Sequence, residues 1–238
     1  MLSRFFKTQL PFRSLGFLLL STWALLFVGA STGADSSIEG TLQLLDGRKD
    51  QTGKEFRTAL VWFEPEADVS VAPPDEPFEM ITVRKEFQPK VLPVPVGSTV
   101  SFPNQDPILH NVFSVSGRNR FDLGLYRGGD AEEKRFEHPG VVRVFCNVHH
   151  AMVAYVAVLE TPFFSRLGRD GSFRLADVPP GPGRLTVWHH RAEPKTLDVS
   201  LPLDAPLLLD LQLTKDQIPR HRNKFGKPYT RKRRGKAY

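Results

Sequence analysis

The segment VVRVFCNVHHAMVAYVAVL, residues 141–159, decides the fold because two strand-like patterns enclose a short loop rich in metal-binding side chains. The patterns on either side of the loop are dominated by Val and aromatic residues, which is typical of β-strands. The loop carries a thiol, an imidazole and a thioether at Cys146, His149 and Met152. Two strands that flank a loop present its side chains convergently from a rigid base. The segment therefore predicts two strands joined by a metal-binding loop.

A second imidazole comes from upstream, in SFPNQDPILHNVF, residues 101–113, where His110 precedes Asn111. Two imidazole nitrogens, one thiolate and one weak thioether form the ligand set of mononuclear copper in electron-transfer proteins. The soft thiolate suits Cu(I) and bonds strongly to Cu(II), and the weak axial thioether does not impose a tetragonal geometry. We therefore predict a single type 1 copper ion held by His110, Cys146, His149 and Met152.

Alternatives exist for each of these residues. A lone Cys or Met often fills a hydrophobic core, and only the joint spacing favours a metal site over packing. Zinc accepts a thiolate and imidazoles, but a thioether is a poor zinc ligand, so zinc does not explain Met152. His150 in place of His149 would give the spacing C-x3-H-x-M, which leaves little room for the thioether. We therefore expect His150 to be exposed, and His221 to be a surface group as well.

The motifs FPNxDxxxHNV and C-x2-H-x2-M resemble those of the cupredoxins, and the short ligand spacing is closest to amicyanin and its plastocyanin relatives. The similarity spans roughly residues 80–160. It implies a Greek-key β-sandwich, a tie between the two ligand loops by Asn111, and a place for His149 near the surface as the electron port. The amicyanin likeness also suggests methylamine oxidation, although a family resemblance does not fix the partner. The stretch between the two ligand clusters fits neither relative well.

The rest of the chain also predicts an all-β protein, because 20 Pro and 18 Gly separate short apolar runs. The motif DGSFRLADVPPG, residues 170–181, and the opening IEGTLQLLDG resemble the transthyretin-like sandwich of carboxypeptidase regulatory-like domains. The resemblance implies a cupredoxin domain inserted in, or fused to, a second small sandwich. The predicted parts are a leader at 1–34, sandwich segments at 36–68 and 163–213, the copper domain at 78–160, and a basic tail at 214–238.

The two ends of the chain carry basic charge. The first 34 residues combine three basic groups with an apolar run and small residues at Ala30 and Ala34, which predicts a cleaved signal peptide; an uncleaved anchor is the alternative. Residues 215–238 hold ten Lys or Arg against one Asp, which predicts disorder. The remainder is mildly acidic. Only one cysteine is present, so an intramolecular disulfide is excluded, and a metal ion would protect the thiol in an oxidising compartment.

These features predict an exported, periplasmic, monomeric electron carrier rather than an enzyme, because four ligands leave no open position for a substrate. Its partners are expected to be redox proteins that bind transiently. The basic tail could dock to an acidic partner or an anionic membrane surface, whereas nucleic acid is not expected in an exported protein. The alternatives are a copper-binding structural or carbohydrate-associated module, and a copper storage or delivery protein.

Overall fold

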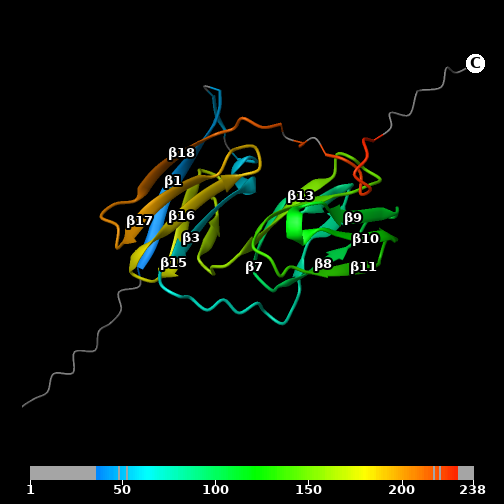
Figure 1. The fold of residues 1–238 in the computed structure, drawn as a ribbon. Helices are drawn as coiled ribbons and strands as arrows, with labels where there is room; N and C mark the ends of the chain where they lie inside the picture. The colour runs from blue at the N-terminus through cyan, green and yellow to red at the C-terminus, as the bar shows by residue number, and fades with distance from the viewer. Residues whose placement is uncertain (1–35, 48, 52, 217, 220, 230–238) are drawn as a thin grey trace, which may run out of the picture. The chain divides into compact units, whose positions relative to one another are not determined.

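The computed structural model describes residues 36–47, 49–51, 53–216, 218–219 and 221–229 (Figure 1). The predicted signal peptide at 1–34, with Ala30 and Ala34, lies outside the described residues. Within them the protein is nearly all β, as the sequence predicts; the helical elements are the 3-10 turns η1 (Phe56–Thr58) and η2 (Gly117–Asn119). Among the described residues, no helix has both the length and the apolar character needed to cross a membrane.

Strands from the two ends of the described chain pair with each other. In one sheet β1 (Ser36–Asp46) lies between β15 (Ser172–Val178), which is antiparallel to it, and β18 (Leu207–Gln212), which is parallel; β2 (Lys49–Gln51) also pairs with β1. A second sheet has the order β14 (Phe164–Arg166), β3 (Ala59–Pro65), β16 (Gly181–His189) and β17 (Lys195–Leu201). Alternate residues of β1 are buried, among them Ile38, Leu42 and Leu44, and they share one core with Phe63 of β3. These flanking strands therefore form a two-sheet sandwich.

The residues between them form further sheets. The five-stranded sheet has the order β10 (Phe121–Tyr126), β9 (His110–Ser114), β12 (Gly140–Phe145), β13 (Val153–Leu159) and β7 (Val91–Pro95). The three-stranded sheet has the order β11 (Ala131–Arg135), β8 (Thr99–Pro103) and β4 (Phe78–Glu79), and a hairpin pairs β5 (Ile81–Val83) with β6 (Glu86–Gln88). Buried Phe102, Phe136 and Val156 belong to the core of these strands. The division into domains at 36–68, 78–160 and 163–213 stays a prediction.

Strand β13 is buried along its whole length because each of its faces packs against a different core. Ala154, Val156 and Val158 belong to the core of the central strands. The alternate residues Val153, Tyr155, Ala157 and Leu159 join a second cluster that includes Leu60 of β3 and Trp188 of β16. Successive side chains of a strand point to opposite faces, so one continuous apolar run serves both clusters.

The strand pairing also brings the two predicted ligand segments together. Strand β12 ends at Phe145, directly before Cys146, and pairs with β13, which begins directly after Met152. Phe145 is also paired with Phe113 of β9, the strand that starts at His110. The loop between β12 and β13 therefore lies beside the start of β9. The stretch between the ligand segments, unexplained by the family resemblance, forms β10 beside β9 and β11 beside β8.

Candidate metal centre

Three of the predicted ligands converge. The Cys146 Sγ lies 3.7 Å from Nδ1 of His110 and 3.9 Å from Nδ1 of His149, and the two Nδ1 atoms are 3.2 Å apart. A point about 2.1 Å from all three atoms exists inside this triangle, which matches metal–nitrogen bonds and is about 0.2 Å shorter than a metal–sulfur bond. His110 and Cys146 are fully buried, whereas His149 is half-buried. The three side chains are thus arranged around a space that fits one ion.

Met152 lies close to this group in the same loop. Its backbone N–H donates to the carbonyl of His149 at 2.9 Å, and its carbonyl accepts from the N–H of Cys146 at 3.3 Å. These two bonds fold the loop into a compact turn. Met152 is buried and belongs to the same core cluster as Cys146. Its role as the axial thioether ligand stays a prediction.

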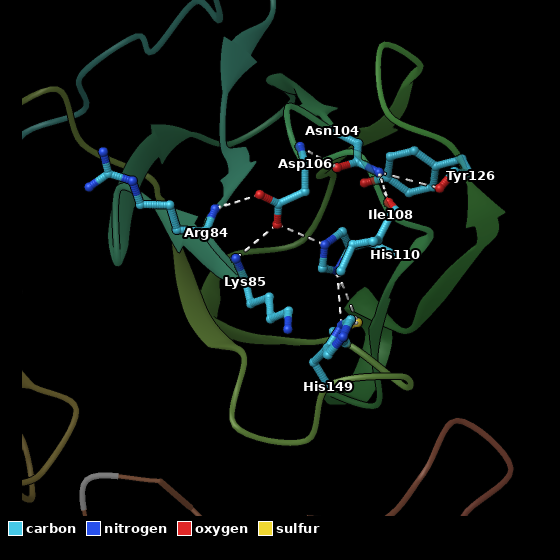
Figure 2. A network of polar contacts seen from close by, with 9 residues as sticks. Arg84, Lys85, Asn104, Asp106, Ile108, His110, Tyr126 and His149 are labelled. Carbon is cyan, nitrogen blue, oxygen red and sulfur yellow. Dashed lines mark hydrogen bonds and ion pairs between the residues drawn. The ribbon is translucent and has the colours of Figure 1, made fainter.

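Asp106 orients the imidazole of His110, a role that the sequence did not reveal (Figure 2). Its Oδ2 lies 2.9 Å from Nε2 of His110. This contact places the ring proton on Nε2 and leaves Nδ1, which faces Cys146, free to bind a metal. Carboxylate–histidine pairs of this kind fix both the tautomer and the direction of a metal-binding ring. Asp106 therefore leaves Nδ1 of His110 available as a donor atom.

Backbone groups hold the Asp106 carboxylate in place. The N–H of Arg84 donates to Oδ1 at 2.6 Å, and the N–H of Lys85 donates to Oδ2 at 2.8 Å. Arg84 and Lys85 have φ values of 55° and 60° in the two-residue turn between β5 and β6, a conformation that normally favours Asn and Gly. Burial would raise the pKa of Asp106, but the bonds from Lys85, Arg84 and His110 outweigh it and lower that pKa below its ordinary value. The carboxylate is therefore charged at neutral pH.

Asn104 shapes the loop that carries Asp106. Its Oδ1 accepts from the N–H of Asp106 at 3.0 Å, and its Nδ2 donates to the carbonyl of Ile108 at 2.9 Å. The side chain thus replaces backbone bonds inside the loop, as Asn commonly does in turns. The signal was present in the sequence: an acid stands four residues before His110, directly after a turn-forming Asn-Gln pair.

Asn111 makes different contacts from those that the family resemblance implies. Its Nδ2 donates to Oδ1 of Asp122 at 2.7 Å and to the carbonyl of Gly124 at 2.6 Å, both in β10. Its Oδ1 is buried without a hydrogen-bond partner among the described residues. The structure therefore places this amide against β10 and not against the loop of Cys146 to Met152. The physical reason is the carboxylate of Asp122, a charged acceptor that the neighbouring strand supplies.

His149 and His150 differ in exposure, as predicted. His150 is exposed, and its ring lies 3.5 Å from that of Tyr229. His149 is half-buried, and its burial, together with the nearby His110 and Lys85, lowers its pKa. A lowered pKa keeps the imidazole neutral, the form that binds metals, over a wider range of acidity. His221, predicted at the surface, is half-buried: its ring stacks on Phe145 at 4.1 Å.

The donor set limits which ions suit the site. One thiolate and two imidazoles that converge in a largely buried place suit copper or zinc. The cluster of His110, Cys146 and His149 therefore fits copper binding.

No family model matches the chain, and no curated protein matches it. Among solved structures, a purple cupredoxin from Nitrosopumilus maritimus is 28% identical, with a TM-score of 0.32, and the match covers 34% of this chain and 99% of that one. A reduced tryptophan-to-tyrosine variant of amicyanin is 24% identical, with a TM-score of 0.34, over 42% of this chain and 98% of its own. A copper-containing nitrite reductase from Thermus scotoductus SA-01 is 28% identical, with a TM-score of 0.35. That match covers 41% of this chain and 26% of the reductase. The transthyretin-like resemblance of the flanking strands stays a prediction.

Proposed function

We propose that this chain is a type 1 copper protein that carries single electrons between redox partners outside the cytoplasm. The observation that supports the proposal best is the convergence of one thiolate sulfur and two Nδ1 atoms within 3.9 Å, from segments separated by 36 residues. His110, Cys146 and His149 would be the strong ligands, and Met152 the weak axial ligand. Bound copper would supply the one-electron couple.

The surrounding residues suit a carrier because they resist rearrangement. Asp106 fixes the ring of His110, and the backbone bonds between Cys146, His149 and Met152 hold the loop in a compact turn. Ligands that hardly move when an electron arrives keep the cost of electron transfer low. Four ligands also leave no position for a substrate, so we propose a carrier rather than an enzyme.

His149 is the proposed outlet for electrons, because it is the partly exposed member of the group that includes the buried His110 and Cys146. Exposed apolar side chains are sequence neighbours of His110 and His149, namely Ile108, Leu109 and Val148. Leu125, also exposed, is the strand partner of Asn111. An apolar surface around a redox centre suits small, short-lived contacts with partner proteins. We therefore propose that redox proteins dock there and that the chain itself is a monomer.

The proposed compartment follows from the sequence of the leader. A basic start, an apolar run and small residues before a polar segment are the features of a secretory signal peptide. A single thiol is also safer in an oxidising compartment when a metal occupies it. We therefore propose export to the periplasm. The resemblance to amicyanin concerns the family and does not identify the redox partner.

The test is to add Cu(II) to residues 35–238 and to record visible and electron paramagnetic resonance spectra. We expect an intense thiolate-to-copper absorption, which Cys146→Ser abolishes because serine supplies no thiolate. His149→Gln should also lose the absorption, whereas His150→Gln should keep it, which separates the two candidate spacings. Voltammetry should show a reversible couple; a metal that exchanges freely without one would favour storage or delivery. A colourless parent protein with verified copper content would refute the proposal.

A further inference from the structure

The basic C-terminal segment is folded where the structure describes it, and it lies against the candidate metal centre (Figure 1, red). Residues 221–229, here called the strap, contain a tight turn organised by Asn223. Its Oδ1 accepts from the N–H groups of Phe225 and Lys227 at 3.0 and 2.9 Å, and its N–H donates to the carbonyl of Lys227 at 2.9 Å. Residues 221–229 thus form a defined turn, while disorder of the tail at 214–238 stays a prediction.

The strap touches residues on both sides of Cys146. The ring of His221 stacks on Phe145, which precedes it, with centroids 4.1 Å apart and planes inclined by 13°. The N–H of Lys224 donates to Oδ1 of Asn147, which follows it, at 3.2 Å. The strap thus contacts the residues directly before and directly after Cys146.

The strap also reaches the neighbours of both imidazoles. The ring of Tyr229 lies 3.5 Å from that of His150, the residue after His149. Lys224 Nζ forms an ion pair with Oδ2 of Asp122 at 2.7 Å, and Oδ1 of the same carboxylate accepts from Asn111, the residue after His110. Each of the three convergent side chains therefore has a sequence neighbour that the strap contacts, directly or through Asp122.

The ion pair of Lys224 is the most specific of these contacts. Lys224 is about one-fifth exposed and Asp122 about two-fifths exposed, so the pair is partly shielded from water. Burial would raise the pKa of Asp122, but bonds from Lys224, Asn111 and Gly124 outweigh it and lower that pKa. One carboxylate thus links a charged strap residue to the start of β9, and a partly desolvated, hydrogen-bonded pair has a defined geometry.

We propose that the strap holds the two metal-binding segments together and slows the escape of the bound ion. The inference rests on the proposed copper site. Movement of the loop of Cys146 to Met152 away from His110 would separate the donor atoms and release the ion. The strap opposes that movement because it is fixed to the loop through Phe145, Asn147 and His150, and to the strand of His110 through Asp122. It thus takes the role of joining the two ligand segments that the family resemblance assigned to Asn111.

The experiment compares copper loss from residues 35–238 and from variants, after reduction and addition of an excess of a coloured Cu(I) chelator. Lys224→Ala and a chain that ends at Pro219 should lose copper about tenfold faster, since outer contacts of metal ligands typically change metal binding by this order. Lys224→Arg keeps a cation near Asp122 and should restore slow loss. Lys227→Ala is the matched control: it removes the same charge from the same turn, and Lys227 forms no ion pair among the described residues.

Two further measurements distinguish a role of the strap in copper retention from an effect on overall stability and from failure of the copper proposal. The unfolding midpoint of the metal-free Lys224→Ala protein should match that of Lys227→Ala, so that faster copper loss does not reflect unfolding. Backbone hydrogen exchange of the metal-free protein should show protection of the strap that Lys224→Ala removes. A blue parent protein whose shortened form and Lys224→Ala form lose copper at the parental rate would overturn the strap inference alone. Exchange of the strap at free-chain rates would overturn it as well, whereas a colourless parent protein would overturn the copper proposal and with it the inference.

Discussion

Asp106→Asn is the substitution that tests the architecture of the site most directly. The Asp106 carboxylate accepts three bonds, from the N–H groups of Arg84 and Lys85 and from Nε2 of His110. Asparagine has nearly the same shape but presents one oxygen and one NH2 group. The NH2 group must then face a donor wherever it points. Replacement therefore changes the hydrogen-bonding pattern without creating a cavity.

The magnitude follows from the two possible orientations of the amide. With its NH2 group toward Arg84, one hydrogen bond to a charged acceptor is lost, worth about 1.5–3 kcal/mol of unfolding free energy. With its NH2 group in the place of Oδ2, the bond from the N–H of Lys85 is lost, and the imidazole of His110 must move its proton to Nδ1, the atom that faces Cys146. Both outcomes weaken the orientation of His110. Because loss of an outer partner of a metal ligand typically costs about 10–100-fold in affinity, we expect a loss of copper affinity within that range.

The assay combines urea unfolding of the metal-free protein with a competition titration of copper against a chelator. Asp130→Asn is the matched control, because the exposed Asp130 accepts from the N–H of Arg127 at 3.2 Å and bonds to no histidine among the described residues. It should leave both quantities unchanged. Parental copper affinity in Asp106→Asn, together with parental unfolding free energy, would refute the role assigned to Asp106.

Three further predictions concern the fold and the ligands. Gly171→Ala should destabilise the protein by about 1–3 kcal/mol more than Gly47→Ala. Both glycines have positive φ, but only at Gly171 would the new Cβ meet a backbone oxygen, at 2.3 Å; urea unfolding measures the difference. Burial, and then the charge of Arg191, lower the pKa of His189 to about 4, so its contribution to stability is complete above about pH 6.5 and is lost as the pH falls toward 4. His189→Gln should remove up to about 3 kcal/mol of the change in unfolding free energy between about pH 6.5 and 4. Unfolding free energies that change equally with pH in the two proteins would contradict this. Met152→Leu conserves volume and should change metal-free stability by less than about 1.5 kcal/mol, while voltammetry should show a higher reduction potential because Cu(II) loses a donor.

Much of the fold could be predicted because the strands are locally encoded. The pattern predicted a strand at 153–159, which is β13, and placed the strand before Cys146 within one residue of β12. Several strands were not predicted, among them β10 and β11. Phe121, Leu123 and Leu125 of β10 alternate with Asp122 and Gly124, but Asp and Gly are residue types depleted in strands. Strand β11 is AEEKR, whose charges suit an exposed edge strand but give no alternation of apolar residues. Their pairing with β9 and β8 is a long-range effect that composition does not report.

The site was predictable to the extent that its spacing is local. Cys146, His149 and Met152 stand on one loop, and their spacing alone indicated a copper site. Asp106 was missed because a carboxylate in a loop has many possible partners until the fold brings backbone donors to it. The strap was missed for a different reason: its basic composition predicts solvation. In the structure it forms an ion pair with Asp122 of β10 and ring contacts with Phe145 of β12 and His150 of the loop.

Burial of both faces of β13 affects how this protein unfolds. Removing the flanking strands would expose one apolar face of β13 to solvent, formed by Val153, Tyr155, Ala157 and Leu159. A bare apolar stripe on a strand invites self-association, so a fragment limited to residues 78–160 should aggregate rather than remain dispersed. Heat should therefore melt the described sandwiches in a single step, with the copper colour lost at the temperature at which the flanking strands unfold.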